Sequence, residues 1–215
     1  MSTPWKFDSE VSKNFNKIAE THIPDYQRVN ELTLNLLKDS IPKNGLIVEL
    51  GCSNGNFISL LNSSGFTKIL GIDQSSDMIN EAMKRNLNAE LVISSNIPEN
   101  LGPVSAIVSN WTIQFNEDKI SILKKIYDSL TENGIFILTE KMTQSALTKK
   151  QYYDWKHSNG VSWDEIQQKE DSLKGVMFSE SLEWWLKTLR EIGFTKINIA
   201  NSYMDFTTMI LIKDV

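Results

Sequence analysis

Short apolar runs and amphipathic segments alternate through the middle of the chain. The apolar runs are rich in β-branched residues and are typical of buried strands, which we expect at 45–51, 67–73, 89–94, 104–110 and 135–140. The segments between them place apolar residues at helical spacing and predict helices at 55–65, 75–86 and 116–134. This alternation predicts βαβ units and therefore a doubly wound α/β fold, with helices on both faces of a parallel sheet.

The two ends of the chain depart from this alternation. Two helices are expected before the first strand, at roughly 9–21 and 25–39, and the polar, aromatic-rich segment 141–178 is typical of a helical insertion. The chain then closes with one helix and two strands, expected at 181–193, 195–201 and 203–213. Because only a short link joins these strands, they should form an antiparallel hairpin.

Length and composition fit one domain. The 215 residues, 40% of them hydrophobic and 23% charged, are enough to bury a sizeable core. We expect a single domain over 1–215, in which the N-terminal helices of 1–44 and the insertion 141–178 form a lid, because loops and insertions at this edge of such sheets commonly carry closure. A net charge of −5 gives no basic footprint, so we do not expect nucleic acid as a partner.

The single cysteine and the apolar patterning bear on location. Cys52 has no partner for an internal disulfide, and we expect it to be a small buried residue rather than a nucleophile. The first ten residues have neither a basic leader nor an apolar core, and no apolar run has the length needed to cross a bilayer. We therefore expect a cytoplasmic protein with no membrane partner and no metal ion.

A glycine-bearing turn, "VELGCSNGNF", follows the first expected strand. At the carboxyl edge of a doubly wound sheet, Gly51 and Gly55 would let the backbone approach a ligand closely. The dinucleotide fingerprint G-x-G-x-x-G is incomplete, because its middle glycine is absent. Glu49 would repel phosphate but suits a cation such as an amino group or a sulfonium. This combination disfavours a nicotinamide oxidoreductase.

An acid ends the second expected strand. Asp73 lies 22 residues beyond Gly51 (73 − 51), and an acid at about this offset is where such folds hold a ribose diol. Its position predicts a nucleoside-containing ligand.

An acid before a glycine loop, followed by a ribose acid one strand later, resembles the class I methyltransferase fold that binds S-adenosylmethionine. This resemblance implies a Rossmann-like methyltransferase sheet, mostly parallel, with an antiparallel last strand. It implies cofactor contacts by Glu49 and the backbone of Gly51, Cys52 and Ser53 near the methionine part, by Asp73 at the ribose, and by Asn96 and Ile97 at the adenine. Gln74 would flank the adenosine, and Gly55 belongs to the same cofactor-binding turn.

A closer resemblance covers nearly the whole chain. The segments "FDSEVSKNF", "IPDY", "ELGCSNG", "NWTIQF", "LTEK", "EIQQKEDSLKGVM" and "EIGF" are similar to the carboxy-S-adenosylmethionine synthase family. That family makes a carboxylated cofactor from prephenate for tRNA wobble-uridine modification. The resemblance implies that Tyr26 and Asn110 also line the cofactor pocket, and that the protein is a homodimer.

One residue departs from that family in charge. In "QQKEDSL" the family carries an arginine that holds the added carboxylate, whereas this chain has Glu170. Two like charges about 4 Å apart at an effective dielectric near 20 repel by roughly 4 kcal/mol, which is on the order of a thousandfold in affinity. We therefore expect Glu170 in the substrate pocket and a preference for unmodified S-adenosylmethionine. Trp111, in the loop after the fourth expected strand, is a further candidate for the wall of the substrate pocket, with packing in the core as the alternative.

The predicted function is S-adenosylmethionine-dependent methyl transfer to an acceptor that is a small molecule or is otherwise unidentified. Carboxy-S-adenosylmethionine synthesis and a non-catalytic cofactor-binding module are the alternatives. Methyl transfer from a sulfonium mainly requires orientation and exclusion of water, so no catalytic base is obligatory. If a base is needed, the candidates around the insertion are Glu140, Tyr152, Tyr153 and His157. Otherwise His157, like His22, is expected to be a surface residue.

Overall fold

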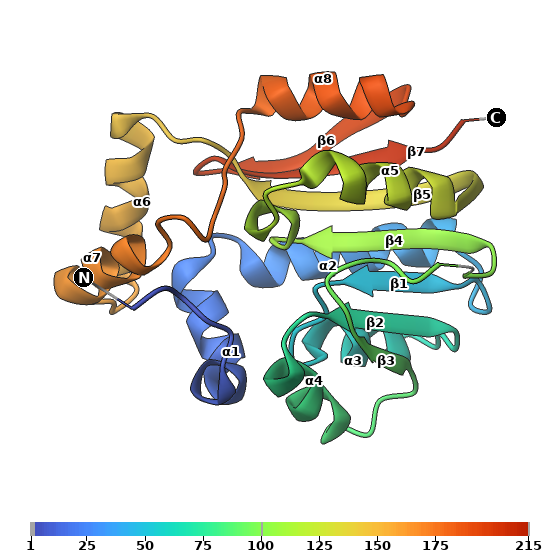
Figure 1. Cartoon of the computed structure of the whole chain (residues 1–215), viewed down its shortest axis with the longest axis horizontal. Helices are drawn as coiled ribbons and strands as arrows, with labels where there is room; N and C mark the ends of the chain where they lie inside the picture. Colours follow the sequence, from blue (N-terminus) through green and yellow to red (C-terminus); the bar gives the residue numbers. More distant parts are fainter. Residues whose placement is uncertain (1–2, 100, 215) are drawn as a thin grey trace.

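The structure is a computed structural model that describes residues 3–99 and 101–214, and a seven-stranded sheet forms its centre (Figure 1). The strands are β1 (Ile47–Leu50), β2 (Ile69–Asp73), β3 (Glu90–Ile93), β4 (Val104–Asn110), β5 (Leu130–Lys141), β6 (Lys196–Tyr203) and β7 (Phe206–Ile212). Their order is β3-β2-β1-β4-β5-β7-β6. The first five strands pair in parallel, and β7 is antiparallel to both of its neighbours. The predicted fold class is confirmed, including the closing hairpin.

Helices cover both faces of the sheet and one of its edges. They are α1 (Ser9–His22), α2 (Tyr26–Ser40), α3 (Asn56–Ser63), α4 (Ser76–Met83), α5 (Lys119–Ser129), α6 (Ala146–Ser158), α7 (Trp163–Ser172) and α8 (Leu182–Ile192), with a short 3₁₀ helix η1 (Ile113–Phe115). One apolar core lies between the sheet and α5 and α8, and includes Trp185 and Leu189. The other lies between the sheet and α2, α3 and α4, and includes Leu37 and Ile58. This is the two-faced arrangement that the alternating pattern predicts.

One helix is shorter than expected. The helix predicted at 116–134 ends at Ser129, and β5 begins at Leu130, whose backbone pairs with Val104 of β4. Asn133 then adopts a left-handed conformation, with φ of 58°. Because Asn tolerates this conformation better than most residues do, the chain turns there instead of continuing as a helix.

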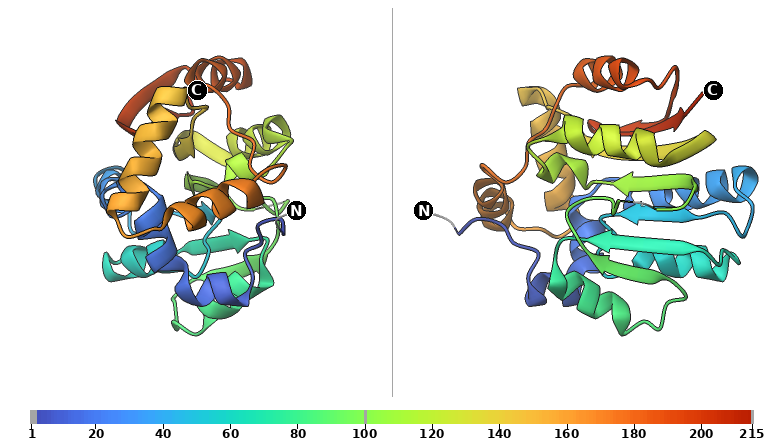
Figure 2. Two further views of the ribbon diagram at one scale, coloured as in Figure 1. Left: turned by 90° about the vertical axis from the view of Figure 1, so that its left-hand side faces the viewer. Right: turned by 45° about the vertical axis from the view of Figure 1, so that its right-hand side comes forward.

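A third apolar cluster closes the carboxyl edge of the sheet, where α1, α6 and α7 lie across the strand ends (Figure 2, left). It joins the N-terminal helices to the insertion through buried Ala19, Tyr26, Tyr152 and Phe206. The Tyr152 hydroxyl donates a hydrogen bond of 2.6 Å to the carbonyl oxygen of His22 at the end of α1. The two segments that fall outside the alternating pattern thus meet over one edge of the sheet. None of the described helices is long and apolar enough to cross a membrane.

Candidate functional site

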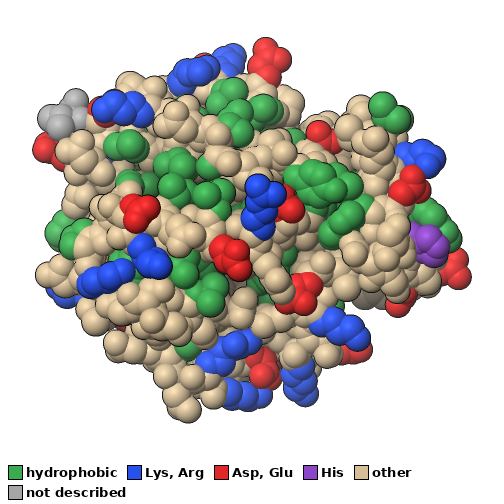
Figure 3. All heavy atoms as spheres, turned by 180° about the vertical axis from the view of Figure 1, so that it is seen from behind, with side chains coloured by type: hydrophobic (Ala, Val, Ile, Leu, Met, Phe, Trp, Pro, Cys, Tyr) green, Lys and Arg blue, Asp and Glu red, His purple; other side chains and the backbone are tan. Residues whose placement is uncertain are grey.

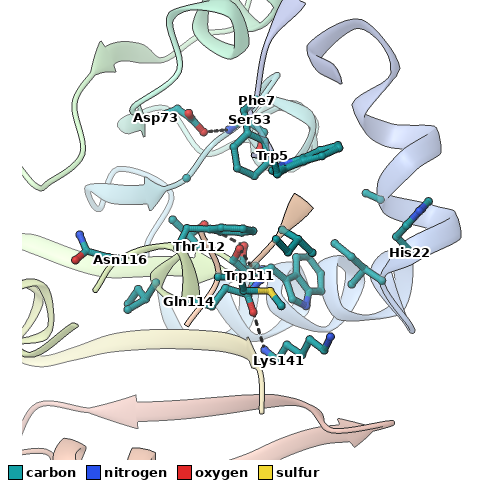
Figure 4. Close-up of a pocket in the computed structure, with 18 of the residues that line it drawn as sticks. Trp5, Phe7, His22, Ser53, Asp73, Trp111, Thr112, Gln114, Asn116 and Lys141 are labelled. Atoms are coloured by element: carbon teal, nitrogen blue, oxygen red, sulfur yellow. Dashed lines mark hydrogen bonds between the residues drawn. The ribbon is translucent and has the colours of Figure 1, made fainter. Parts of the chain in front are cut away.

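A cavity lies at this carboxyl edge, between the strand ends and the helices that cover them. The sheet contributes the turn after β1, the end of β2, and the loops after β3 and β4. The N-terminal arm and α1 form another wall, and α6 and α7 complete the lining. Figure 4 shows Asp73 and Ser53 at one end of this cavity and Lys141 at the opposite end. Ligands of open α/β sheets bind in this position.

The turn after β1 is held tightly against β2. The backbone N–H groups of Gly51 and Cys52 donate hydrogen bonds of 2.7 and 2.9 Å to the carbonyl oxygen of Ile72. Gly51 has a φ of +80°, and a Cβ atom there would collide with the side chain of Thr112. Gly55 has a φ of +75°, and its Cβ would lie 2.5 Å from Leu87. Only glycine fits either position without strain. Of the two, Gly51 lines the cavity.

Asp73 ties the second strand to this turn. Its Oδ2 accepts a hydrogen bond of 2.9 Å from the Ser53 N–H, and its Oδ1 accepts one of 2.8 Å from the Ser75 N–H. Burial raises the pKa of the carboxyl group, while the two N–H donors favour its ionised form. Each carboxylate oxygen can accept further hydrogen bonds, and Asp73 lines the cavity. Asp73 can therefore bind a diol without giving up its contacts to the turn.

Glu49 lies on β1, just before the turn, and is only 8% exposed. Its Oε2 atom has no hydrogen-bond partner in the described part of the chain. Burial raises the pKa of Glu49 well above its ordinary value, and the nearby Asp73 adds to this shift. The buried Oδ1 atom of Asn110 likewise has no partner among the described residues. Orphaned acceptors of this kind fit a ligand with a cationic amino group or sulfonium, so these residues suit S-adenosylmethionine.

Several residues expected to contact the cofactor do not line the cavity. Tyr26 packs on the Trp111 ring, 5.2 Å between centroids, and does not reach into the cavity as expected. Cys52 is buried, and burial raises the pKa of its thiol. Ile97 belongs to the main core, and Asn96 turns back to accept the Ile97 N–H at 2.9 Å.

Other residues occupy the expected positions around the cavity. Ser94 and Ser95, from the loop after β3, line it where Asn96 and Ile97 were expected. The predicted residues that do line it are Gly51, Ser53, Asp73, Gln74, Asn110, Trp111 and Tyr152. Gly55 and Glu49 lie outside the lining.

Glu140 does not face the cavity and is unsuited to the role of catalytic base. It is fully buried, and its two oxygens accept the N–H groups of Ile113 and Gln114 at 2.8 and 2.9 Å. Burial raises its pKa to about 8, although these donors favour the carboxylate. Its role is to hold the backbone turn that follows β4.

Of the remaining candidate bases, one lines the cavity and two lie elsewhere on the insertion. Tyr152 lines the cavity, but burial raises its pKa well above the ordinary value. Tyr153 and His157 lie outside the lining, and His157 stacks on Trp163 with 4.5 Å between ring centroids. His22, expected at the surface, lines the cavity instead, and burial and Lys156 lower its pKa to about 4.

Glu170 lies outside the cavity lining, contrary to expectation. Its Oε1 atom forms an ion pair of 3.1 Å with Lys149 Nζ. Burial raises the pKa of Glu170, but the Tyr153 hydroxyl and the charges of Lys141 and Lys149 outweigh it and leave the pKa lowered. The charge that distinguishes this chain from the family it resembles is thus paired with Lys149 outside the cavity lining, while the Glu170 Oε2 atom has no hydrogen-bond partner among the described residues.

Sequence reasoning missed two groups of lining residues. Trp5 and Phe7 belong to the N-terminal arm, which crosses the Asp73 end of the cavity (Figure 4). The arm is fixed by the Trp5 N–H, which donates 2.8 Å to the Ser172 carbonyl oxygen. The second group is three lysines at positions 141, 156 and 169. They come from three different elements, so no local spacing could reveal them.

The outer surface carries charges of both signs. Figure 3 shows acidic and basic side chains interspersed on the face opposite to the view of Figure 1, with no large basic area. Such a surface offers no electrostatic stripe for a polyanion on that face.

Comparison with known sequences gives consistent matches. A family model described as a methyltransferase domain matches residues 22–198. Carboxy-S-adenosyl-L-methionine synthase of Nautilia profundicola is 32% identical over 221 residues, covering 97% of this chain and 94% of that protein. The protein of the same name from Campylobacter jejuni subsp. doylei is 33% identical, covering 98% of this chain and 94% of its own length.

Solved structures share the fold at lower identity. A putative S-adenosyl-L-methionine-dependent methyltransferase from Methanococcus maripaludis superposes with a TM-score of 0.69 at 23% identity, covering 100% of this chain and 97% of that one. Magnesium protoporphyrin IX methyltransferase from Synechocystis, solved with bound S-adenosylhomocysteine, gives a TM-score of 0.70 at 13% identity, covering 97% and 96%. At these identities the likeness establishes the fold alone.

Proposed function

We propose that this chain, which belongs to the methyltransferase-domain family and to the carboxy-S-adenosyl-L-methionine synthase family, binds S-adenosylmethionine in the described cavity and transfers the methyl group to a small acceptor. The observation that carries the proposal is the hydrogen bond from the turn to Asp73, together with the Glu49 carboxyl oxygen that has no partner in the described residues. Asp73 would bind the ribose diol, and Glu49 would compensate the cationic methionine part.

The residues of the cavity would orient the two substrates and exclude water from the reaction. S-Adenosylmethionine, when bound, supplies a methyl group on an already activated sulfonium. Trp111, Tyr152 and Phe206 form an apolar wall, and Trp5 and Phe7 cover the Asp73 end. Positioning and exclusion of water are the main requirements of an in-line displacement. Glu140 accepts hydrogen bonds from backbone N–H groups, and the Tyr152 hydroxyl donates to the His22 carbonyl oxygen. The acceptor should therefore be nucleophilic without deprotonation by either group.

A labelled methyl donor tests this function. Incubation of the protein with S-adenosylmethionine carrying a labelled methyl group, and with fractionated extracts of metabolites and of RNA, should label a compound in the metabolite fraction. The Asp73→Ala variant should label it much more weakly. Label confined to the RNA fraction would contradict the proposed acceptor class, and no label in either would favour a non-catalytic binding module.

A second candidate function is carboxy-S-adenosylmethionine synthesis, the activity that names the relatives. Glu170 was the sequence-based reason to disfavour it, and Glu170 is paired with Lys149 outside the cavity. Lys141, Lys156 and Lys169 line the cavity instead and would tolerate an added carboxylate. The two candidates differ in the cofactor that the protein holds, a difference that can be measured directly.

We also propose that the arm, α1 and the insertion act as a lid. All three line the cavity, and Tyr152 joins α6 to the end of α1. Saturating S-adenosylhomocysteine should therefore slow amide hydrogen exchange in α1, α6 and α7 while leaving α8 unchanged. The lid would be refuted if the protein bound S-adenosylhomocysteine but the amide exchange rates of these three helices did not change.

We propose a cytoplasmic homodimer. A buried free thiol at Cys52 suits a reducing compartment, and the edge strand β6 leaves the apolar side chains of Ile199 and Tyr203 exposed.

A further inference from the structure

A second cavity lies between α1, the N-terminal arm and α7. It has a volume of about 720 Å³ and is more open to solvent than the first cavity. Trp5, Ile18, His22 and Lys169 line both cavities, so only side chains separate the two. A reagent in solution can therefore reach this wall through the second cavity without passing the Asp73 end of the first.

Lys169 is the side chain on this wall that carries a nucleophile. Of the three lysines that line the first cavity, only Lys169 also lines the second. Lys156 is 2% exposed and Lys141 7%, so both are closed off from solution, whereas Lys169 is half-buried. Lys169 forms no ion pair in residues 3–99 and 101–214, although Lys174, five positions on, pairs with Asp171 at 2.7 Å. Its amine is thus reachable and is not held by a carboxylate.

The surroundings of Lys169 favour its neutral form. Burial and the charge of Lys156 lower the pKa of Lys169 to about 6, from an ordinary value near 10.4. The Lys169 amine lies over the Trp5 ring, which recovers only part of the cost of burying an ammonium group. At pH 7 roughly nine-tenths of such side chains carry a free lone pair, against about one in 2,500 for an ordinary lysine. A desolvated amine of this kind is an activated nucleophile.

The second cavity also carries a charge that suits a phosphate leaving group. Lys17 of α1 lines it and would attract a phosphate. Glu165 lines it as well, but its Oε2 atom accepts hydrogen bonds of 2.8 and 2.7 Å from the N–H and hydroxyl groups of Ser162 in a capping box. The carboxylate is thereby held at the start of α7, and the Lys17 ammonium group is left to meet an anion.

We propose that Lys169 is an acylation site, modified by a small acyl phosphate that enters through the second cavity. The Lys169 nitrogen forms a bond to the acyl carbon, and the bond between that carbon and the phosphate oxygen breaks. The phosphate leaves with the proton that the nitrogen loses. The product is an amide, which is not protonated near neutral pH. This site needs neither S-adenosylmethionine nor a methyl acceptor, so it stands independently of the proposed function.

Acylation of Lys169 should displace the N-terminal arm. The added acyl group would occupy the space where the amine now contacts the Trp5 ring. At this point the arm is held by the Trp5 N–H, which donates 2.8 Å to the Ser172 carbonyl oxygen. The Trp5 amide should therefore exchange its hydrogen faster in the acetylated protein than in the unmodified one. Equal exchange rates would contradict this effect on the arm.

Acetyl phosphate is the probe that tests the site. The full chain would be incubated with it at pH 7, and acetylation at each lysine followed by peptide mass spectrometry. Lys169 should react at least about tenfold faster than Lys125, an exposed lysine of α5. The larger neutral fraction outweighs the lower intrinsic reactivity of a less basic nucleophile, which costs on the order of a hundredfold with the dependence that thiols show.

Two controls separate an activated amine from a merely accessible one. The acetylation rate of Lys169 should level off above about pH 7 to 8, whereas a lysine of ordinary pKa gains roughly tenfold per pH unit up to pH 9. The charged and titratable groups that face Lys169 are Lys17 and His22 of α1, Lys156 of α6 and Glu165 of α7. Lys17→Met should slow acetylation of Lys169 by acetyl phosphate, and it should leave acetylation by N-acetoxysuccinimide, which has no phosphate, unchanged.

Two results would overturn the acylation site. One is acetylation of Lys169 that is no faster than that of Lys125, and the other is a rate at Lys169 that keeps rising tenfold per pH unit to about pH 9. Acetylation by acetyl phosphate that is indifferent to Lys17→Met would overturn the assignment of an acyl phosphate as the reagent. Lys17 is exposed, so its replacement leaves the core intact.

Discussion

Replacing Asp73 by alanine should weaken S-adenosylhomocysteine binding roughly 10- to 100-fold. A charge-assisted contact to a ribose diol contributes about 1.5 to 3 kcal/mol, and the substitution removes it. It also removes the acceptors of the Ser53 and Ser75 N–H groups, which loosens the turn that approaches the ligand. Isothermal titration calorimetry of the purified variant measures the loss.

Two further variants separate these effects. Asp73→Asn keeps an acceptor for the turn while losing the charge, so its affinity should fall between the parent and Asp73→Ala. Asp128→Ala, at an exposed position on α5 outside the cavity lining, should bind like the parent. Unchanged affinity in Asp73→Ala would remove Asp73 from the ligand site.

Replacing Lys156 by methionine should stabilise the ligand-free protein, and more so at pH 6.5 than at pH 9. Methionine has a similar length and carries no charge into the 2% exposed site. The pKa of Lys156 is lowered to about 7, mainly by burial, from an ordinary value near 10.4. The folded parent therefore resists protonation that the unfolded chain accepts.

The sign of the pH dependence follows from that difference. Between about pH 7 and pH 10 the unfolded state of the parent binds more protons at Lys156 than the folded state does. The free energy of unfolding of the parent therefore increases as pH rises through this range. Below pH 7 the penalty is fully present. Each pKa unit is worth about 1.4 kcal/mol, so the advantage of Lys156→Met should shrink by on the order of 2 kcal/mol from pH 6.5 to pH 9.

Denaturant unfolding of both proteins at the two pH values measures this change. The other charges that face Lys156 are those of Lys141, Lys149, Lys169, Glu170 and His22, and they are present in both proteins. Lys150→Met, at an exposed position on the same helix, should change little at either pH. An advantage of Lys156→Met that is independent of pH would show that Lys156 keeps its ordinary pKa.

The fold could be predicted because its signals are local. Strands buried on both faces form apolar runs, and each helix between them has its own apolar stripe, so order and topology follow from the sequence. The Gly51 turn and Asp73 were predictable for the same reason, because each directly follows a strand. The end of α5 could not be predicted, because the helix stops where Leu130 pairs with Val104, which is distant in the sequence.

The other end of the cavity depends on contacts between distant segments. Lys169 and Glu170 are adjacent on α7, so their side chains point about 100° apart, and only Lys169 lines the cavity. A sequence comparison identifies the changed residue but not the direction in which its side chain points. Likewise, the stacking of Tyr26 on Trp111 joins residues 85 positions apart (111 − 26). The arm residues Trp5 and Phe7 have no local pattern that points to a cavity.

Mass spectrometry of the small molecule released from the freshly purified protein tests the central claim most directly. The protein should carry unmodified S-adenosylmethionine or S-adenosylhomocysteine, and incubation with S-adenosylmethionine and prephenate should form no carboxylated product. Recovery of carboxy-S-adenosylmethionine, or its formation on adding prephenate, would contradict methyl transfer and establish the synthase activity. A protein that carries no adenosyl compound and takes up neither S-adenosylmethionine nor S-adenosylhomocysteine would contradict the assignment of the Asp73 cavity itself.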